Sequence, residues 1–209
     1  MIIVNFKAYR EATGEKAEKL SKQCLKASKE SGEKVISVPQ HTDMGRVKGD
    51  FFGQHLDPVE PGSHTGHTTA EALKAAGASG TLINHSEKRI DPEKIEKSVE
   101  RAKEKGLTSV VCAQSPEECE EFSKFDPDFV AFEPPELIGG DISVSSARPE
   151  LIQEAVERSE VDVLTGAGIK SQEDVEKSVE LGCKGVLVAS AVVKAENSYE
   201  EIMELCRGL

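Results

Sequence analysis

Eight short apolar runs, separated by amphipathic helical segments, recur along the chain and constrain its fold more than any other feature. The runs are rich in β-branched residues and mostly lack the alternation of apolar and polar residues typical of a half-exposed strand. We therefore expect parallel strands that are buried on both faces. The expected strands are 2–6, 35–38, 51–55, 80–84, 109–112, 129–132, 161–164 and 185–188.

Helix start signals follow several of these runs. Ser115 precedes Pro116 and has Glu118 three residues further on, which is the pattern of a capping box with proline at the first helical position. Two further helix starts are expected at Asp91, which precedes a proline, and at Ser171, which precedes an acidic turn. Eight strand–helix units in one uninterrupted chain favour a closed (β/α)8 barrel over an open, doubly wound sheet.

The chain has 209 residues, which is short for such a barrel, and two segments account for the shortfall. Segment 39–50 contains Gly45 and Gly49 and has room for little more than one or two helical turns. Segment 149–160, before the seventh strand, is similarly brief. We expect shortened outer helices around a single catalytic domain spanning 1–209, because no linker or low-complexity tract divides the sequence.

Composition narrows the class of protein. The net charge of −12 argues against nucleic-acid binding, because the phosphate backbone favours clustered Lys and Arg. No run approaches the roughly 18 apolar residues that span a bilayer, and the N-terminus lacks a signal-peptide pattern. We expect a cytoplasmic protein with no membrane partner. Five cysteines without C-x-x-C spacing argue against disulfides and structural zinc.

One stretch of the sequence carries the pattern of a catalytic base beneath a lid. The sixth apolar run ends at Glu133, and Pro134 and Pro135 follow at once. An apolar pair and the glycines 139 and 140 come next. Prolines stop the strand and stiffen one hinge, while glycines allow backbone geometry that other residues resist. The result is an acid at a strand end, under a short loop with a hinge on each side.

Polar residues at the other strand ends could complete such a site. In a (β/α)8 barrel the catalytic residues lie at the carboxyl ends of the strands, so these groups are expected to meet at one mouth. Turns of small residues there expose backbone N–H groups that favour an anion such as phosphate. The strand-end groups are Asn5 and Lys7, Gln54 and His55, His85 and Glu87, Gly166 to Gly168, and Ala189 with Ser190.

These motifs together resemble the triosephosphate isomerase family, in its compact archaeal form, over essentially the whole chain. The resemblance implies a TIM barrel that interconverts dihydroxyacetone phosphate and D-glyceraldehyde 3-phosphate in glycolysis and gluconeogenesis, by proton transfer through an enediolate. It also implies that no cofactor or metal is needed. The motifs are residues 5–7, 61–67, 84–89, 132–139, 166–168 and 188–190.

The resemblance also implies roles for individual residues. Glu133 would be the base, and neutral His85 would polarise the carbonyl and move protons between the two oxygens. Lys7 would supply a fixed positive charge, and Asn5 a side-chain hydrogen bond. The remaining residues would bind substrate (Phe6, Ile138, Gly139, Gly168, Ala189, Ser190) or support the site (Glu87, Ser86, Thr65).

The resemblance assigns the loop His64-Thr65-Gly66-His67 to a subunit interface. It would reach into a neighbouring subunit and support that subunit's site, so we expect a homo-oligomer, either a tetramer or a dimer. A long loop with few contacts of its own is costly to order, which also favours a partner. The spacing of His64 and His67 suits no common metal-ligand pattern.

Two other functions compete with this interpretation. The first is that of another sugar-phosphate barrel enzyme, such as an aldolase or a prenyl- or indole-type synthase. An aldolase would need a Schiff-base lysine inside the barrel, whereas Lys7 is expected at the mouth. An inactive phosphometabolite-binding protein is the other, and the retained Lys7, His85 and Glu133 argue against it. The lid departs from the family pattern, because Gly139-Gly140-Asp141 replaces Gly-Thr-Gly.

Overall fold

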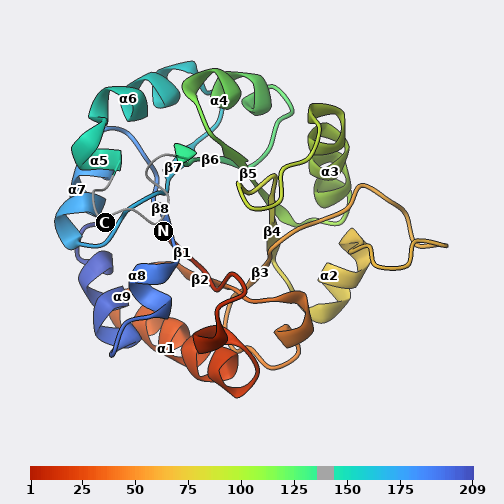
Figure 1. Cartoon of the computed structure of the whole chain (residues 1–209), viewed down its shortest axis with the longest axis horizontal. Helices are drawn as coiled ribbons and strands as arrows, with labels where there is room; N and C mark the ends of the chain where they lie inside the picture. Colours follow the sequence, from red (N-terminus) through yellow and green to blue (C-terminus); the bar gives the residue numbers. More distant parts are fainter. Residues whose placement is uncertain (136–143) are drawn as a thin grey trace.

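The computed structural model describes residues 1–135 and 144–209 (Figure 1). Eight parallel strands make one sheet in the order β2-β1-β8-β7-β6-β5-β4-β3, and the helices surround it. The strands are β1 (Ile2–Asn5), β2 (Val35–Val38), β3 (Phe52–Gly53), β4 (Gly80–Ile83), β5 (Thr108–Ala113), β6 (Phe129–Phe132), β7 (Val163–Thr165) and β8 (Val186–Val188).

The two ends of this strand order meet and bring the sheet close to a closed barrel. A single parallel bridge joins Ser37 of β2 to Phe51, directly before β3. The Ser37 backbone N–H also donates to the Asp50 carbonyl at 3.1 Å. The expected (β/α)8 barrel is therefore confirmed. Strand β3 has two residues, shorter than the five expected, because the chain leaves the sheet at Gln54.

Helices follow the strands in the expected order. Ser115 accepts a hydrogen bond from the Glu118 backbone, as its motif predicted, and Ser171 forms a complete capping box with Asp174. The helices are α1 (Glu15–Ser31), α2 (Ala70–Ala76), α3 (Pro92–Glu104), α4 (Pro116–Ser123), α5 (Val144–Ala147), α6 (Pro149–Arg158), α7 (Gln172–Glu180), α8 (Ser190–Val193) and α9 (Ser198–Cys206).

The two segments expected to be short differ from each other. Between β2 and β3, segment 39–50 forms only the 3-10 turn His41–Asp43, as its glycines predicted. Segment 149–160 instead carries α6, a ten-residue helix of nearly three turns. The sequence there has no internal glycine and begins with proline at the first helical position, so the helix continues to Arg158.

The barrel core explains why the strand sequences do not alternate in polarity. Alternate residues of each strand point into the barrel or outward to the helices, and both directions are apolar. Every strand contributes to one interior cluster, which contains Ile3, Ile36, Val38, Phe52, Leu82, Val110, Cys112, Ala131, Leu164 and Leu187. Across 1–135 and 144–209, the helices are too short or too polar for any of them to cross a bilayer.

Candidate active site

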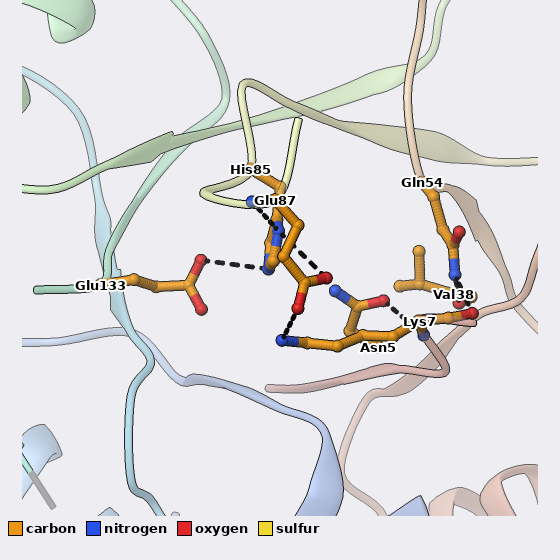
Figure 2. Close-up of polar contacts among 7 residues, drawn as sticks. All are labelled: Asn5, Lys7, Val38, Gln54, His85, Glu87 and Glu133. Carbon is orange, nitrogen blue, oxygen red and sulfur yellow. Dashed lines mark hydrogen bonds and ion pairs between the residues drawn. The ribbon is translucent and has the colours of Figure 1, made fainter. Parts of the chain in front are cut away.

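The end of β1 turns the Lys7 side chain into the mouth of the barrel. Asn5 is 4% exposed, and its Oδ1 accepts the Lys7 backbone N–H at 3.0 Å. Lys7 has φ of 46°, an uncommon value for a residue with a Cβ. The Gln54 amide donates to the carbonyls of Lys7 (2.9 Å) and Val38 (3.2 Å), which ties this turn to β2 (Figure 2).

Lys7 is held at the site by an ion pair. Its Nζ lies 2.9 Å from Glu87 Oε1, and the Lys7 side chain is 11% exposed while that of Glu87 is 59% exposed (Figure 2). The pair is therefore open to solvent on the Glu87 side. Screening by water there leaves the ammonium free to respond to a second anion close by.

His85 follows β4, and its ring orientation is set by a local hydrogen bond. The Glu87 backbone N–H donates to His85 Nδ1 at 3.1 Å. A ring nitrogen that accepts a hydrogen bond carries no proton, so the neutral ring has its proton on Nε2. That Nε2 points toward Glu133 (Figure 2). The sequence around His85 thus presents a neutral N–H donor to the mouth of the barrel.

Glu133 lies at the end of β6, opposite His85. Its backbone N–H donates to the Ala113 carbonyl at 2.8 Å, and the residue is 6% exposed. Glu133 Oε2 lies 3.7 Å from His85 Nε2, too far for a hydrogen bond (Figure 2). Both atoms are buried, and neither has a hydrogen-bond partner among the described residues. Two unsatisfied polar atoms in one buried site indicate a position for a reacting group.

The surroundings of the Glu133 carboxylate are tight. A Cβ built on Gly166 would lie 2.7 Å from Glu133 Cγ and 2.8 Å from Oε1, so any residue larger than glycine at this point after β7 would displace the Glu133 side chain. Cys112 of β5 is buried beside the same carboxylate. Burial, together with the nearby negative charge of Glu133, raises the pKa of the Cys112 thiol well above its usual value. This thiol is therefore neutral and acts as packing.

A pocket opens beside these groups, between the ends of β6, β7, β8 and β1. Ala167 and Gly168 both have positive φ, at 67° and 76°, so the turn after β7 presents backbone to the pocket. Lys194 lies over the Tyr9 ring at 4.4 Å from its centroid. The pocket is lined by Asn5, Lys7, Tyr9, His85, Glu133, Ala167, Gly168, Ile169, Lys170, Leu187, Val188, Ala189, Ser190 and Ala191.

The structure brings most of the predicted site residues together and leaves others apart. Asn5, Lys7, His85, Glu133, Gly168, Ala189 and Ser190 line one pocket. Phe6 is fully buried in the core and does not line that pocket. Ser86 adjoins His85, and its Oγ is buried without a hydrogen-bond partner among the described residues. Ile138, Gly139 and the Asp141 hinge lie outside the described residues.

A second pocket adjoins the first and has several histidines in its lining. It is lined by Asn5, Lys7, Ala8, His41, Gln54, His55, His85, Glu87 and Lys88. Nearby, the loop 60–67 is exposed along its whole length, and the His64 and His67 rings lie edge to face on it. Thr65 belongs to this exposed loop. Within 1–135 and 144–209, no group of three or more His, Cys, Asp or Glu side chains could hold a metal ion.

Sequence reasoning missed the residues that hold the site in place. Gln54 was expected at the mouth without a role, whereas its amide anchors the Lys7 turn. Gly166 was recognised only as part of a small-residue turn, whereas its missing side chain leaves room for Glu133. Each of these roles depends on a contact with a residue that is distant in the sequence, so no local sequence pattern predicts it.

The fold and the site define a class of protein: a (β/α)8-barrel enzyme with a carboxylate, a neutral imidazole and an ammonium at the carboxyl ends of its strands. The triosephosphate isomerase family model matches residues 1–206. The chain is 46% identical to the triosephosphate isomerase of Methanothermus fervidus over 214 residues, covering 98% of this chain and 96% of the relative. It is 42% identical to that of Methanocaldococcus jannaschii over 216 residues, covering 99% of each.

A solved structure agrees in fold. The crystal structure of triosephosphate isomerase from Bartonella henselae superposes with a TM-score of 0.71 at 19% identity, covering 99% of this chain and 97% of the other. The chain belongs to the triosephosphate isomerase family. It is an isomerase of glycolysis that interconverts dihydroxyacetone phosphate and glyceraldehyde 3-phosphate.

Proposed function

We propose that Glu133 is the base of this isomerisation and that His85 is the donor that makes its proton transfer possible. The observation that carries the proposal is the pair of buried, unsatisfied atoms, Glu133 Oε2 and His85 Nε2, that face each other 3.7 Å apart. A carboxylate on one side of the substrate would take the proton from carbon. An N–H on the other side would bind the oxygen that gains charge.

The two groups must act together. A C–H proton next to a carbonyl is far less acidic than a carboxylic acid, so Glu133 alone removes it too rarely. The His85 Nε2–H stabilises the enediolate oxygen as negative charge develops, and it can then pass protons between the two oxygens. One preorganised donor of this kind is worth about 10²- to 10³-fold in kcat. Glu133 returns its proton to the neighbouring carbon, which completes the isomerisation.

Lys7 and Asn5 supply the rest of the electrostatic environment. The Lys7 ammonium already neutralises one anion, Glu87, at 2.9 Å, and lines the same pocket as Glu133. It would stabilise both the substrate phosphate and the enediolate. Asn5 holds the Lys7 backbone through its Oδ1, which leaves its Nδ2 to donate toward the substrate.

The phosphate group would be bound by backbone N–H groups that line the same pocket. Gly168, Ala189 and Ser190 line it after β7 and β8, where (β/α)8 barrels often bind phosphate. Ile138 and Gly139, which lie outside the described residues, would also contact the phosphate. Binding of the remote phosphate would supply energy for excluding water from the enediolate.

The chain is also proposed to work as a homo-oligomer in the cytoplasm. The exposed loop 60–67 is long for a segment with so few contacts of its own. The second pocket, lined by Lys7, Glu87 and His55 among others, has an open side where the same loop of another copy could be received. Thr65, on this exposed loop, would then support the neighbour's Lys7 and Glu87. Both a dimer and a tetramer can contain this contact.

Replacing the base by its amide tests the assignment. Glu133→Gln keeps size and shape, so it should retain affinity for dihydroxyacetone phosphate while losing most of its turnover in a coupled assay. Glu180→Gln, at the exposed C-terminal end of α7 and away from the pocket, is the matched control and should keep full turnover. A folded Glu133→Gln variant with unchanged kcat would contradict the role of Glu133.

A further inference from the structure

Asn84 is a buried side chain directly before His85 to which the proposed reaction gives no role. It is 1% exposed and has φ of 63°, in the left-handed region. Asparagine tolerates this region better than most residues, but the conformation still needs support from its surroundings. The backbone turns there, since β4 ends at Ile83 and a hydrogen bond from the Lys88 N–H to the His85 carbonyl closes the next turn at 2.7 Å.

The Asn84 side chain makes two hydrogen bonds in different directions. Its Nδ2 donates to the Cys112 carbonyl of β5 at 3.0 Å. Its Oδ1 accepts the backbone N–H of Ile90, six residues further along, at 3.0 Å. These bonds close segment 84–90 into a loop and fasten it to the strand whose Cys112 lies beside the Glu133 carboxylate. One side chain therefore links the segment that carries His85 to the neighbourhood of the base.

The hydrogen bond that orients His85 lies inside this closed loop. Glu87, whose N–H donates to His85 Nδ1, is between the two ends that Asn84 joins. A second clamp, from the Arg89 guanidinium to both carboxylate oxygens of Glu118 at 2.9 Å and 2.5 Å, holds the outer side of the loop to α4. That clamp is partly exposed, whereas the Asn84 to Cys112 bond is buried and is the stronger constraint.

We propose that Asn84 is a positioning residue for the isomerisation. Its bonds to Cys112 and Ile90 hold loop 84–90 so that the Glu87 N–H stays on His85 Nδ1 and the ring presents Nε2–H to the substrate. This inference rests on the proposed role of His85. A displacement of about 1 Å in a reacting group costs roughly 10²-fold in rate, so loss of the two bonds should lower kcat by about 10- to 100-fold.

Asn84→Gly is the informative variant, because glycine adopts positive φ without strain and removes only the side-chain bonds. Asp126→Gly is the matched control: Asp126 has φ of 58° and lies before β6, at the other end of the barrel from the site. Both variants would be assayed for kcat and KM, for the free energy of unfolding in urea, and for the ¹⁵N shifts of the His85 ring. Asn84→Asp, which keeps the acceptor for Ile90, serves if the glycine variant does not fold.

The expected result is a fall in kcat of about 10- to 100-fold with a much smaller change in KM, together with ring shifts that depart from a single Nε2–H tautomer. Asp126→Gly should change neither. The same Asn84 change made on a His85→Gln background should then have little further effect, since Asn84 acts through His85. Unchanged kcat and unchanged ring shifts in folded Asn84→Gly would overturn the inference, and so would an equal loss of kcat on the His85→Gln background.

Failure of the proposed function is distinguishable from failure of this inference. If His85→Gln alone retains full turnover, the role of His85 is wrong. The ring shifts of Asn84→Gly still report directly whether Asn84 sets the orientation and tautomer of that ring. A single unchanged Nε2–H tautomer in Asn84→Gly contradicts the positioning role whichever way the activity of His85→Gln falls.

Discussion

Gly166→Ala should displace the Glu133 carboxylate without changing its chemical nature. The added Cβ would lie 2.7 Å from Glu133 Cγ, 2.8 Å from Oε1 and 3.0 Å from Cδ. Carbon atoms prefer separations of about 3.5 Å or more, so the side chain must move by roughly 0.8 Å. Glu133 is 6% exposed and has the Cys112 thiol nearby, which restricts where it can go. The carboxylate therefore leaves its place opposite His85 Nε2.

The expected loss follows from this displacement. A misplacement near 1 Å costs about 10²-fold in rate, which corresponds to roughly 2.7 kcal/mol of activation free energy. Overpacking should lower the free energy of unfolding by about 1–3 kcal/mol. The coupled isomerase assay and urea unfolding measure the two effects separately. The kcat of folded Gly166→Ala should fall about 100-fold.

Gly45→Ala is the control for this experiment. Gly45 lies in the short segment after β2, its φ is not positive, and an added Cβ would meet no described atom within 4 Å. Turnover of Gly45→Ala should equal that of the wild type. If Gly166→Ala folds and keeps wild-type kcat, turnover does not depend on the position that the turn after β7 gives to Glu133, and the reasoning is refuted.

Three further predictions concern charge, pH and thiols. Lys7→Gln should lower kcat/KM at least about 100-fold in the coupled assay, because it removes the pocket cation that faces Glu87; a loss below threefold would contradict that role. Burial lowers the pKa of His41 and of His55 below 6.5, so the unfolded chain binds their protons more readily. The free energy of unfolding should therefore be highest above pH 6.5 and fall below it, by up to about 1.4 kcal/mol per pH unit for each proton. Urea unfolding at pH 7.5 and pH 5 measures this fall, which should be smaller in the double variant His41→Asn/His55→Asn. An equal fall in the wild type and the double variant would refute the assignment to these histidines. All five cysteines are free and buried, and burial raises the pKa of Cys24 and Cys183 to about 12. The native protein should therefore not react with a thiol reagent at pH 8, whereas all five thiols of the unfolded chain should react. Rapid reaction of a thiol in the native protein would contradict this packing.

The fold could be predicted from the sequence because its signals are local. Buried parallel strands have apolar residues on both faces, and the eight runs showed this directly, as in Val110 and Val111 of β5. Errors arose where length alone was used. Segment 149–160 looked as short as 39–50, but α6 forms in the first and only a 3-10 turn in the second, since Gly45 and Gly49 occur in the second alone.

The meeting of Glu133, His85 and Lys7 at one pocket could also be predicted, because a strand end fixes the place of each residue. Glu133 directly follows β6, His85 and Lys7 lie two residues after β4 and β1, and the barrel brings those strand ends together. The supporting residues could not be found this way. Gln54 holds a carbonyl 47 positions away, and Gly166 fits against a side chain from another strand. Such contacts exist only once the barrel has closed, so they become visible in the structure.

The fate of the transferred hydrogen reveals whether Glu133 acts as the base. Isomerisation through an enediolate passes the proton to the enzyme, where it can exchange with solvent. We would convert dihydroxyacetone phosphate to product in D₂O and locate deuterium by NMR. We expect deuterium on the product carbon next to the carbonyl with the wild type, and almost no product with Glu133→Gln. Product formed at the wild-type rate by folded Glu133→Gln, with or without deuterium, would contradict a role for Glu133 as base.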